Sequence, residues 1–219
     1  MFRSWGEIKS VCRQLLNAVQ FLHHHWVMHR DIKPTNLLYT SNGVMKLCDF
    51  GMARKYSDPL RTYTKEVVTL WYRSPENLLG KKYYSEAIDN WSVGCVLAEL
   101  IKGRPMFRGQ GEADQIHEIF KVLGKPNETT WPGVTGLPNY NQLSWRLPSD
   151  NTLRNCFPRA FDTPPGTLVL SNTGFTLLNG LLEPMPENRL TAKDAYESPW
   201  FMEHPAALVS ADMPQFRKN

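Results

Sequence analysis

The sequence predicts a mainly α-helical domain that contains one short β-hairpin. Several segments repeat apolar residues every three or four positions, which is the period of an amphipathic helix. Two short β-rich runs flank Asn42-Gly43, a strong hairpin turn signal. At 219 residues the chain is longer than a typical domain, so one large domain with a real core is favoured, and two small domains remain the alternative.

The first predicted helix covers residues 7–25, and it is followed by the hairpin. Its apolar positions form one stripe, made by Ile8, Val11, Leu15, Ala18, Val19 and Leu22. The hairpin strands are "NLLY" and "VMKLCDFG", with "TSNG" between them. The polar segment at residues 29–36 is therefore expected in a loop between a helix and a hairpin.

The middle of the chain combines a long loop with a buried helix. Residues 52–75 show no sustained period, and so long a loop in a compact domain is usually functional. Residues 86–103 are apolar around most of the helical circumference and end at Gly103 before Pro105. Such a segment is expected to be a central helix rather than a surface helix.

Three further helices are expected in the second half, at residues 113–124, 172–183 and 191–198. The stretch at 125–165 is rich in Pro, Asn and Trp and has little periodicity. No internal repeat is present, so one mainly helical domain accounts for the pattern.

The composition excludes several classes of protein. With 42% hydrophobic and 21% charged residues it is that of a globular protein. The 25 basic and 21 acidic residues give a net charge of +4 without a run of five like charges, so no direct nucleic-acid binding is expected. The first ten residues carry charges, and the longest apolar region, 91–101, is too short to span a bilayer. We therefore expect an intracellular soluble protein, nuclear or cytoplasmic, without membrane contact.

The cysteines and the histidine run are not expected to bind metal. Cys12, Cys48, Cys95 and Cys156 are far apart in sequence and form no C-x-x-C pair, so they are expected to be reduced, buried thiols. The histidines at 23–25 close the first helix, where they complement its carbonyl groups and dipole.

The segment "HRDIKPTN" at residues 29–36 carries the chemistry. It contains Asp31, Lys33 and Asn36, and Asp49 follows thirteen residues after Asn36. Oxygen donors on loops that flank one hairpin can converge on Mg²⁺, which prefers few protein oxygens plus phosphate oxygens. Asp31 is then free to orient a hydroxyl group and Lys33 to neutralise a phosphoryl group. Each residue alone has a simpler interpretation, as a solvated loop carboxylate, a turn residue or half of a surface ion pair.

Together with "DFG" and "SPE", in this order and followed by "DNWSVGC", the segment resembles the eukaryotic protein kinases. "DFGMAR", "YTKEVVTLWYRSPE", "PMFRG" and "WPG" are similar to the cyclin-dependent kinases of the CMGC group. "SDPL", "VLGKPNETTWPG" and "DMPQF" most resemble the PITSLRE and plant G-type branch.

The resemblance implies a protein-kinase-like α+β fold of which this chain is the mainly α-helical C-terminal lobe with a short β-hairpin, the N-terminal lobe being missing. It also implies these boundaries: kinase domain 1–201, catalytic loop 29–36, activation segment 49–76, family-specific insert about 125–165 and C-terminal tail 202–219.

The resemblance also assigns the catalytic roles. Asp31 is the catalytic base, and Lys33 contacts the γ-phosphate of ATP. Asn36 and Asp49 hold Mg²⁺. Lys33, Asn36, Leu38 and Asp49 thus form the cofactor site, with Leu38 under the adenine.

Other roles follow from the same resemblance. Thr69 would brace the catalytic loop, and Thr64 is the activation-segment phosphosite, gripped by Arg30 and Arg54. The position that accepts proline after the target Ser or Thr would be lined by Val67, Val68 and Arg73. Val67 and Val68 could instead be core residues.

Three residues are expected to be structural: Glu76 would pair with Arg189, and Asp89 would hold the catalytic-loop backbone.

The implied function is a Ser/Thr protein kinase of the cyclin-dependent type, acting on Ser/Thr-Pro sites in proteins and regulated by a cyclin. The chain shows no glycine-rich loop, no strand lysine and no helix with its matching Glu, so we expect a truncated chain that is inactive alone and lacks the main cyclin-binding helix. The alternative is a noncatalytic kinase-like module that binds substrates or regulators.

Overall fold

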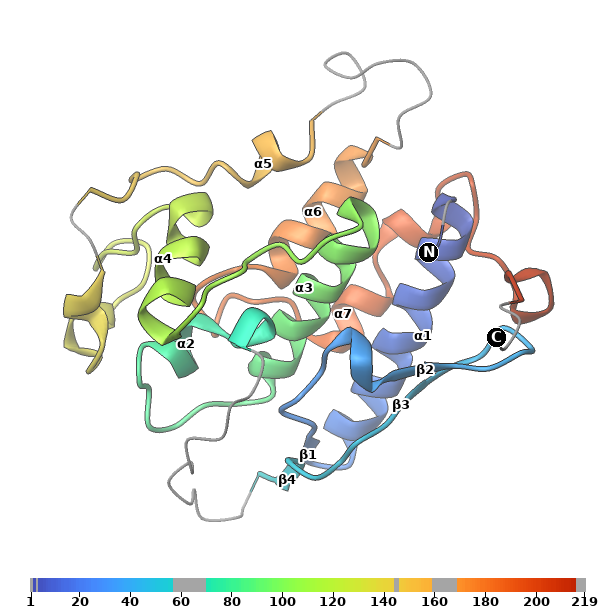
Figure 1. The fold of residues 1–219 in the computed structure, drawn as a ribbon, viewed down its shortest axis with the longest axis horizontal. Helices are drawn as coiled ribbons and strands as arrows, with labels where there is room; N and C mark the ends of the chain where they lie inside the picture. Colours follow the sequence, from blue (N-terminus) through green and yellow to red (C-terminus); the bar gives the residue numbers. More distant parts are fainter. Residues whose placement is uncertain (1, 3, 57–69, 144–145, 159–168, 216–219) are drawn as a thin grey trace.

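The computed structural model describes residues 2, 4–56, 70–143, 146–158 and 169–215. In these ranges the α-helices are α1 Trp5–His24, α2 Pro75–Leu78, α3 Ala87–Lys102, α4 Glu112–Leu123, α5 Leu153–Cys156, α6 Asn172–Leu181 and α7 Ala192–Tyr196. Two antiparallel pairs of short strands, β1 Val27–Met28 with β4 Arg54–Lys55 and β2 Leu37–Tyr39 with β3 Met45–Leu47, lie along one side of the helices (Figure 1). The predicted architecture, mainly helical with a hairpin, is confirmed.

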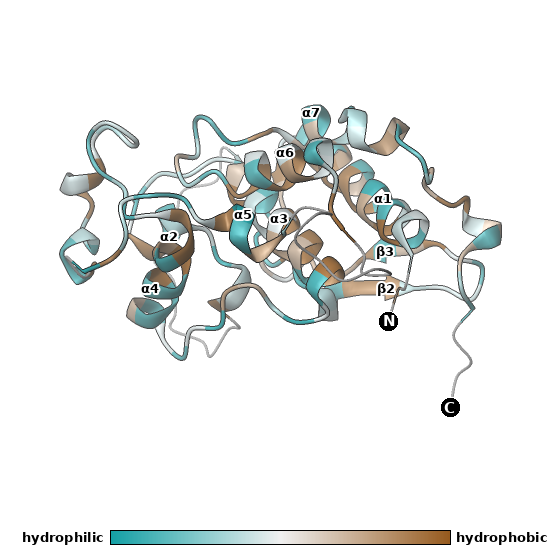
Figure 2. Ribbon diagram, turned by 90° about the horizontal axis from the view of Figure 1, so that it is seen from above, coloured by the Kyte–Doolittle hydropathy of each residue, from teal (hydrophilic) through white to brown (hydrophobic). Residues whose placement is uncertain are grey.

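Helix α3 is the centre of the core, as its all-round apolar sequence predicted. Twelve of its 16 residues are buried, and it packs against α1 on one side and α6 on another (Figure 1). Hydrophobic residues gather around it in the view from above (Figure 2). Trp91 is fully buried and stacks on Phe107 with the ring centroids 5.9 Å apart. The helix ends at Gly103, whose left-handed φ of 70° suits glycine at a C-cap.

Helix α1 begins at Trp5, two residues before the predicted start. Its N-cap is Ser4, whose hydroxyl accepts a bond from the Glu7 N–H at 3.3 Å, while the Ser4 N–H donates to the Glu7 carboxylate at 3.4 Å. This reciprocal capping box satisfies two N–H groups that would otherwise have no partner. It fixes the first turn of the helix.

Residues 52–75, predicted to be a loop without regular structure, contain two short elements in their described part. They are β4 and a 3-10 turn, Leu70–Tyr72. A strand of two residues is too short to show an alternating pattern, so the sequence could not reveal it. In the described part of the expected irregular stretch 125–165, the structure has α5 and two 3-10 turns, Val134–Gly136 and Tyr140–Gln142.

All four cysteines are free, and two of them differ from the prediction. Cys12 and Cys95 are buried, and burial raises the pKa of the Cys12 thiol to about 12. Cys48 and Cys156 are only partly buried, because each lies near the end of a short element rather than on a core-facing helix. Among the described helices, none is long and apolar enough to cross a membrane.

The predicted Asn42-Gly43 turn joins β2 to β3 and also docks the C-terminal segment. Gly43 has a φ of 77°, and a Cβ there would collide with the Ser210 carbonyl oxygen and lie 2.8 Å from Met213 Cβ.

We expect Gly43→Ala to lower the free energy of unfolding by about 2 to 4 kcal/mol, since backbone strain and overpacking both contribute. Gly133→Ala is the control, because Gly133 has a φ of 82° but open space around it. Equal losses in urea denaturation of the two variants would contradict a docked turn.

Candidate active site

The predicted catalytic loop, residues 29–36, lies between β1 and β2, and its Lys33 and Asn36 side chains both bond one oxygen of Asp31. Lys33 Nζ donates to Asp31 Oδ2 at 2.7 Å. The Asn36 side-chain amide donates to the same oxygen at 3.0 Å and to the Asp31 carbonyl at 2.8 Å. The three residues that the sequence singled out are thus brought together. Both side-chain donors use Oδ2, and no side chain of the described residues bonds the second carboxylate oxygen, Oδ1.

Asp89, at the first turn of α3, holds the backbone of this loop. Its fully buried carboxylate accepts the His29 N–H at 2.8 Å and the Arg30 N–H at 2.7 Å. Arg30 has a φ of 72°, which is costly for a residue with a Cβ, so these bonds stabilise a strained turn. His23 Nε2 lies 3.0 Å from Asp89 Oδ2. The prediction that the histidines at 23–25 complement helix carbonyl groups is confirmed for His25, whose Nδ1 lies 2.8 Å from the Phe21 carbonyl oxygen, whereas the His23 ring bonds a carboxylate 66 positions away.

His29 connects the catalytic loop to the segment that carries Asp49, a role the sequence analysis missed. Its ring is fully buried; Nδ1 accepts the Asp31 N–H at 3.3 Å, and Nε2 lies 3.0 Å from the Cys48 carbonyl oxygen. Since Nδ1 accepts, Nε2 carries the proton and donates it to that carbonyl. The ring also meets the Phe50 ring edge to face at 4.9 Å. Its place in "HRD" was the only sequence signal for this contact.

Asn36 and Asp49 reach the same region through the backbone. The Cys48 N–H donates to the Asn36 carbonyl oxygen at 2.9 Å, so Asp49 follows directly after a residue bonded to Asn36. Asp49 has a φ of 62° and is exposed, and one of its carboxylate oxygens accepts the Gly51 N–H at 3.3 Å. The Asn36 side-chain nitrogen donates to Asp31, which makes the side-chain oxygen of Asn36, Oδ1, a candidate ligand for a cation. Two such oxygens suit a Mg²⁺ ion that takes its remaining ligands from phosphate and water.

Glu76 and Arg189 form a buried, bidentate ion pair. The two guanidinium nitrogens Nη1 and Nη2 donate to Oε1 and Oε2 at 2.8 and 2.9 Å, and both side chains are fully buried in this contact. Arg189 also donates to the carbonyl groups of Ala87, Glu183 and Pro184 at 2.8 to 3.0 Å. The pair therefore joins α2, the start of α3 and the segment before α7.

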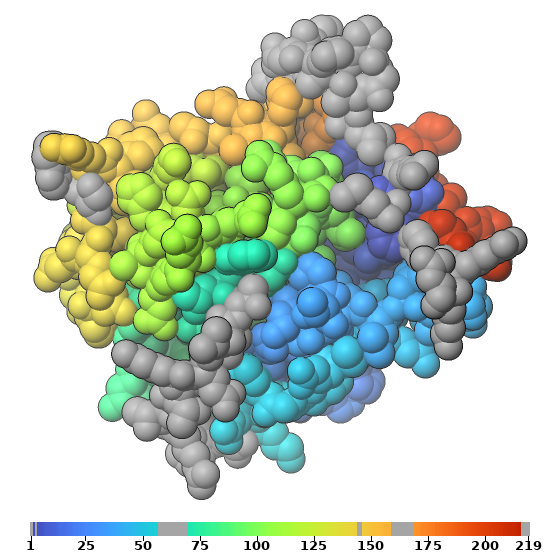
Figure 3. Space-filling view, in the orientation of Figure 1, coloured from blue at the N-terminus to red at the C-terminus, as the bar shows by residue number. Residues whose placement is uncertain are grey.

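The other predicted site residues lie outside the hydrogen-bonded cluster around Asp31. Leu38 on β2 is 54% exposed. Arg54 lies on β4, exposed and opposite Met28, and Arg30 lies over the Tyr84 ring at 5.6 Å. Arg73 donates to Glu112 at 3.2 Å. Four predicted residues are outside the described part of the chain: Thr64, Val67, Val68 and Thr69. The loop and hairpin (blue to cyan) form a continuous surface beside the teal and green segments that follow (Figure 3).

Asp89→Asn is expected to loosen the catalytic loop without unfolding the protein. An amide keeps one acceptor oxygen but turns an N–H group toward the second buried donor, at a cost of about 1 to 3 kcal/mol. Amide hydrogen exchange of His29 or Arg30 should become at least about tenfold faster. The control is Asp150→Asn, which changes an exposed carboxylate. Unchanged exchange at both amides would contradict the anchoring role of Asp89.

Comparisons with known proteins agree with the motif pattern. The family model "Protein kinase domain" matches residues 2–201. The chain is 47% identical over 213 residues to cyclin-dependent kinase G1 of Arabidopsis thaliana, and the match covers 97% of this chain and 34% of the relative. It is 48% identical to the probable cyclin-dependent kinase 10 of Dictyostelium discoideum (96% and 55% covered) and 44% identical to human cyclin-dependent kinase 11B (95% and 25% covered). The chain thus spans between about a quarter and about half of the length of these relatives.

Proposed function

The chain belongs to the protein kinase family and is similar to its cyclin-dependent members, and we propose that it forms the large lobe of a Ser/Thr kinase that transfers the γ-phosphate of ATP to Ser/Thr-Pro sites in proteins. The observation that supports this most is the arrangement around Asp31, whose Oδ2 binds Lys33 and Asn36 while no side chain of the described residues bonds Oδ1. Phosphoryl transfer depends on positioning and charge stabilisation more than on covalent chemistry. Here the Asp31 carboxylate would provide the positioning, and Lys33 beside it would provide the charge stabilisation.

In this proposal each polar group of the loop has one task. Asp31 orients the target hydroxyl and accepts its proton. Lys33, 2.7 Å from Asp31, neutralises charge on the transferred phosphoryl group. Asn36 and Asp49 would hold Mg²⁺, which neutralises phosphate charge when bound. Leu38, exposed on β2, would contact the adenine.

Substrate and partner roles complete the proposal. In this proposal Val67, Val68 and Arg73 would line the place for the proline after the target residue, and Thr69 would brace the loop. The Arg73 contact with Glu112 holds that guanidinium against α4, which supports a role in shaping this place. A cyclin is the proposed regulatory partner.

Specificity for proline can be tested with a protein in which residues 1–219 follow the segment that precedes the matching region in the Arabidopsis relative; we call it the fused protein. With a cyclin and Mg-ATP, it should phosphorylate a Ser-Pro peptide at least about tenfold faster than the matched Ser-Ala peptide. Equal rates would contradict the proposed specificity for proline but not the proposed phosphoryl transfer.

Thr64 is the proposed activating phosphosite. A phosphate adds nearly two negative charges, which Arg30 and Arg54 would bind. After incubation with a kinase that activates cyclin-dependent kinases, peptide mass spectrometry should place the phosphate on Thr64, and Thr64→Val should abolish it. Phosphate only on Thr62 or Tyr63 would contradict this assignment.

A second candidate is the noncatalytic module, and one observation favours it for residues 1–219 taken alone. Leu38 is 54% and Phe50 is 49% exposed beside the catalytic loop, so the described residues present an open apolar face where a nucleotide would need enclosure. We therefore expect negligible transfer by the 219-residue polypeptide alone. The two candidates differ in what the fused protein does.

A further inference from the structure

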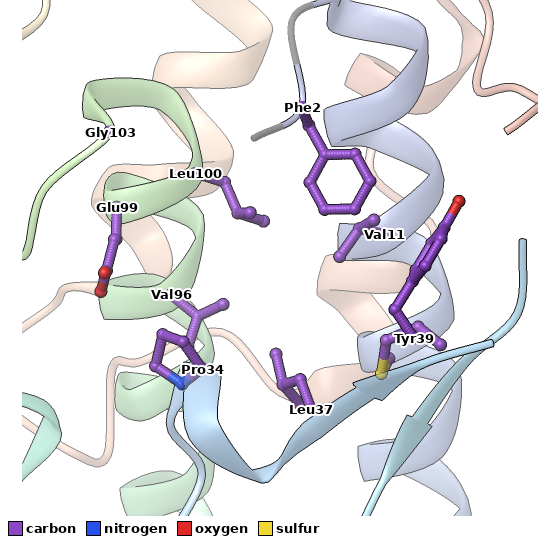
Figure 4. Close-up of a pocket in the computed structure, with 10 residues that line it drawn as sticks. Phe2, Val11, Pro34, Leu37, Tyr39, Val96, Glu99, Leu100 and Gly103 are labelled. Carbon is purple, nitrogen blue, oxygen red and sulfur yellow. The ribbon is translucent and has the colours of Figure 1, made fainter. Parts of the chain in front are cut away.

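The 3-10 turn Leu70–Tyr72 is fastened to the central helix α3. The Tyr72 hydroxyl donates to Glu99 Oε2 at 2.6 Å, and the Tyr72 carbonyl oxygen accepts the Ser92 hydroxyl at 2.8 Å. Glu99 borders an apolar cavity between α1, α3 and the β2–β3 hairpin, but its carboxylate is turned away from that space, on the flank of α3 (Figure 4). These bonds hold the middle residue of the turn, Trp71, beside α3.

The loop between α3 and α4 is bonded both to Trp71 and to α4. The Trp71 indole N–H donates to the Gly109 carbonyl oxygen at 3.0 Å, and the Gly109 N–H donates to the side-chain oxygen of Gln115 at 2.8 Å. Gln115 is fully buried, and a Cβ at Gly109 would lie 2.4 Å from the Gln115 Cα, so the loop is in close contact with the helix. The backbone next to Arg108 is therefore fixed from two sides.

Arg108 lies on this loop with its guanidinium group over the Trp71 ring, 5.1 Å from the ring centroid. Arg108 is exposed, and in the described part of the chain no ion pair includes it. Arg73 differs, because it pairs with Glu112 at 3.2 Å. Stacking on an aromatic face holds a guanidinium group in place and leaves its N–H edge for a carboxylate. Arg108 thus presents a preorganised positive charge that no acidic side chain of the described residues balances.

The Trp71 platform adjoins the place proposed for the substrate. Asp31, Tyr72 and Arg73 line one small hollow, and Trp71 directly precedes Tyr72 in the chain. A substrate bound at Asp31 and Arg73 would therefore have a neighbouring segment close to the Arg108 guanidinium group.

We propose that Arg108 selects protein substrates that carry an acidic side chain near the target Ser or Thr, through charge-assisted hydrogen bonds to the carboxylate. This inference rests on the proposed function, of which it specifies the substrate class. Because the guanidinium group is held in place before binding, it loses less side-chain entropy than a mobile surface arginine. A well-placed glutamate in the substrate should raise kcat/KM by about three- to tenfold.

The test uses a set of Ser-Pro peptides in which a single glutamate occupies each position on either side of the Ser-Pro pair in turn. The reference peptide has glutamine at all of these positions. With the fused protein, at least one glutamate peptide should have a kcat/KM about three- to tenfold above that of the reference. Arg108→Gln should bring this ratio to about one. Arg104→Gln, which changes another exposed arginine after α3, is the matched control and should keep the ratio.

Peptide binding to the 219-residue polypeptide is measured as well, because it does not require phosphoryl transfer. The NMR signal of the Trp71 indole N–H reports binding next to Arg108. At least one glutamate peptide should have a lower Kd than the reference peptide. This difference should disappear in Arg108→Gln and shrink as the salt concentration rises.

If the fused protein is active, the kcat/KM comparison decides the role of Arg108. If it transfers phosphate to no peptide, the proposed function fails and the Kd comparison alone decides. Equal values for all glutamate peptides and the reference would overturn the inference. A preference for glutamate that Arg108→Gln leaves unchanged, or that Arg104→Gln removes as fully, would also overturn it.

Discussion

Asp31→Asn should reduce phosphoryl transfer by the fused protein on the order of a hundred- to ten-thousandfold, the range expected for loss of a general base. Asparagine fills the same volume and can still accept a bond from Lys33, so the loop should keep its shape. It cannot take up the proton of the target hydroxyl at neutral pH. Initial rates with radiolabelled ATP measure the loss.

The matched control is Asp212→Asn, because Asp212 is exposed and lies far along the chain in the C-terminal segment. It should leave the rate unchanged. Circular dichroism and the thermal midpoint should be the same for both variants. If Asp31→Asn kept more than about a tenth of the rate, Asp31 would not be the base.

Arg189→Ala should be the most destabilising single change at the site, with a loss of about 3 to 5 kcal/mol in the free energy of unfolding. The truncation leaves the Glu76 carboxylate fully buried without its bidentate partner. It also removes the donor to the Ala87 carbonyl at the start of α3. Urea denaturation of the 219-residue polypeptide measures the loss.

A double variant distinguishes the stability lost to an unpaired buried charge from the stability lost to poorer packing. Glu76→Gln combined with Arg189→Met leaves no buried ion, so it should lose less stability than Arg189→Ala. Arg104→Ala, at an exposed position after α3, is the control and should change little. A loss below about 1 kcal/mol for Arg189→Ala would show that the pair contributes little to holding α2 and α3 together.

The sequence predicted elements with strong local signals. Residues 86–103 became α3, because the apolar pattern and the glycine stop are both local, and the hairpin formed where Asn42-Gly43 predicted it. Strand β4 was missed, because its pairing with β1 involves only two residues of each strand. The start of α1 was misplaced, because the pattern of apolar residues does not include the Ser4 cap.

The contacts of the site also divide into those that a local sequence pattern predicts and those that it does not. Asp31, Lys33 and Asn36 lie within six residues, so their meeting could be anticipated from one loop. The contact between His23 and Asp89 spans 66 positions, so no local sequence pattern predicts it. The expected pair of Glu76 and Arg189 spans 113 positions and came from the family resemblance alone. The family prediction itself is confirmed by the match over residues 2–201.

Transfer of radiolabelled phosphate from ATP to a Ser-Pro peptide tests the proposed role of the Asp31 cluster most directly. It should be measured for the 219-residue polypeptide, for the fused protein and for the fused protein with Asp31→Asn, each with a cyclin and Mg²⁺. We predict transfer by the fused protein only, because the cluster needs a nucleotide held in line with the target hydroxyl. A folded fused protein that transfers no more phosphate than its Asp31→Asn variant would contradict a catalytic role for this loop.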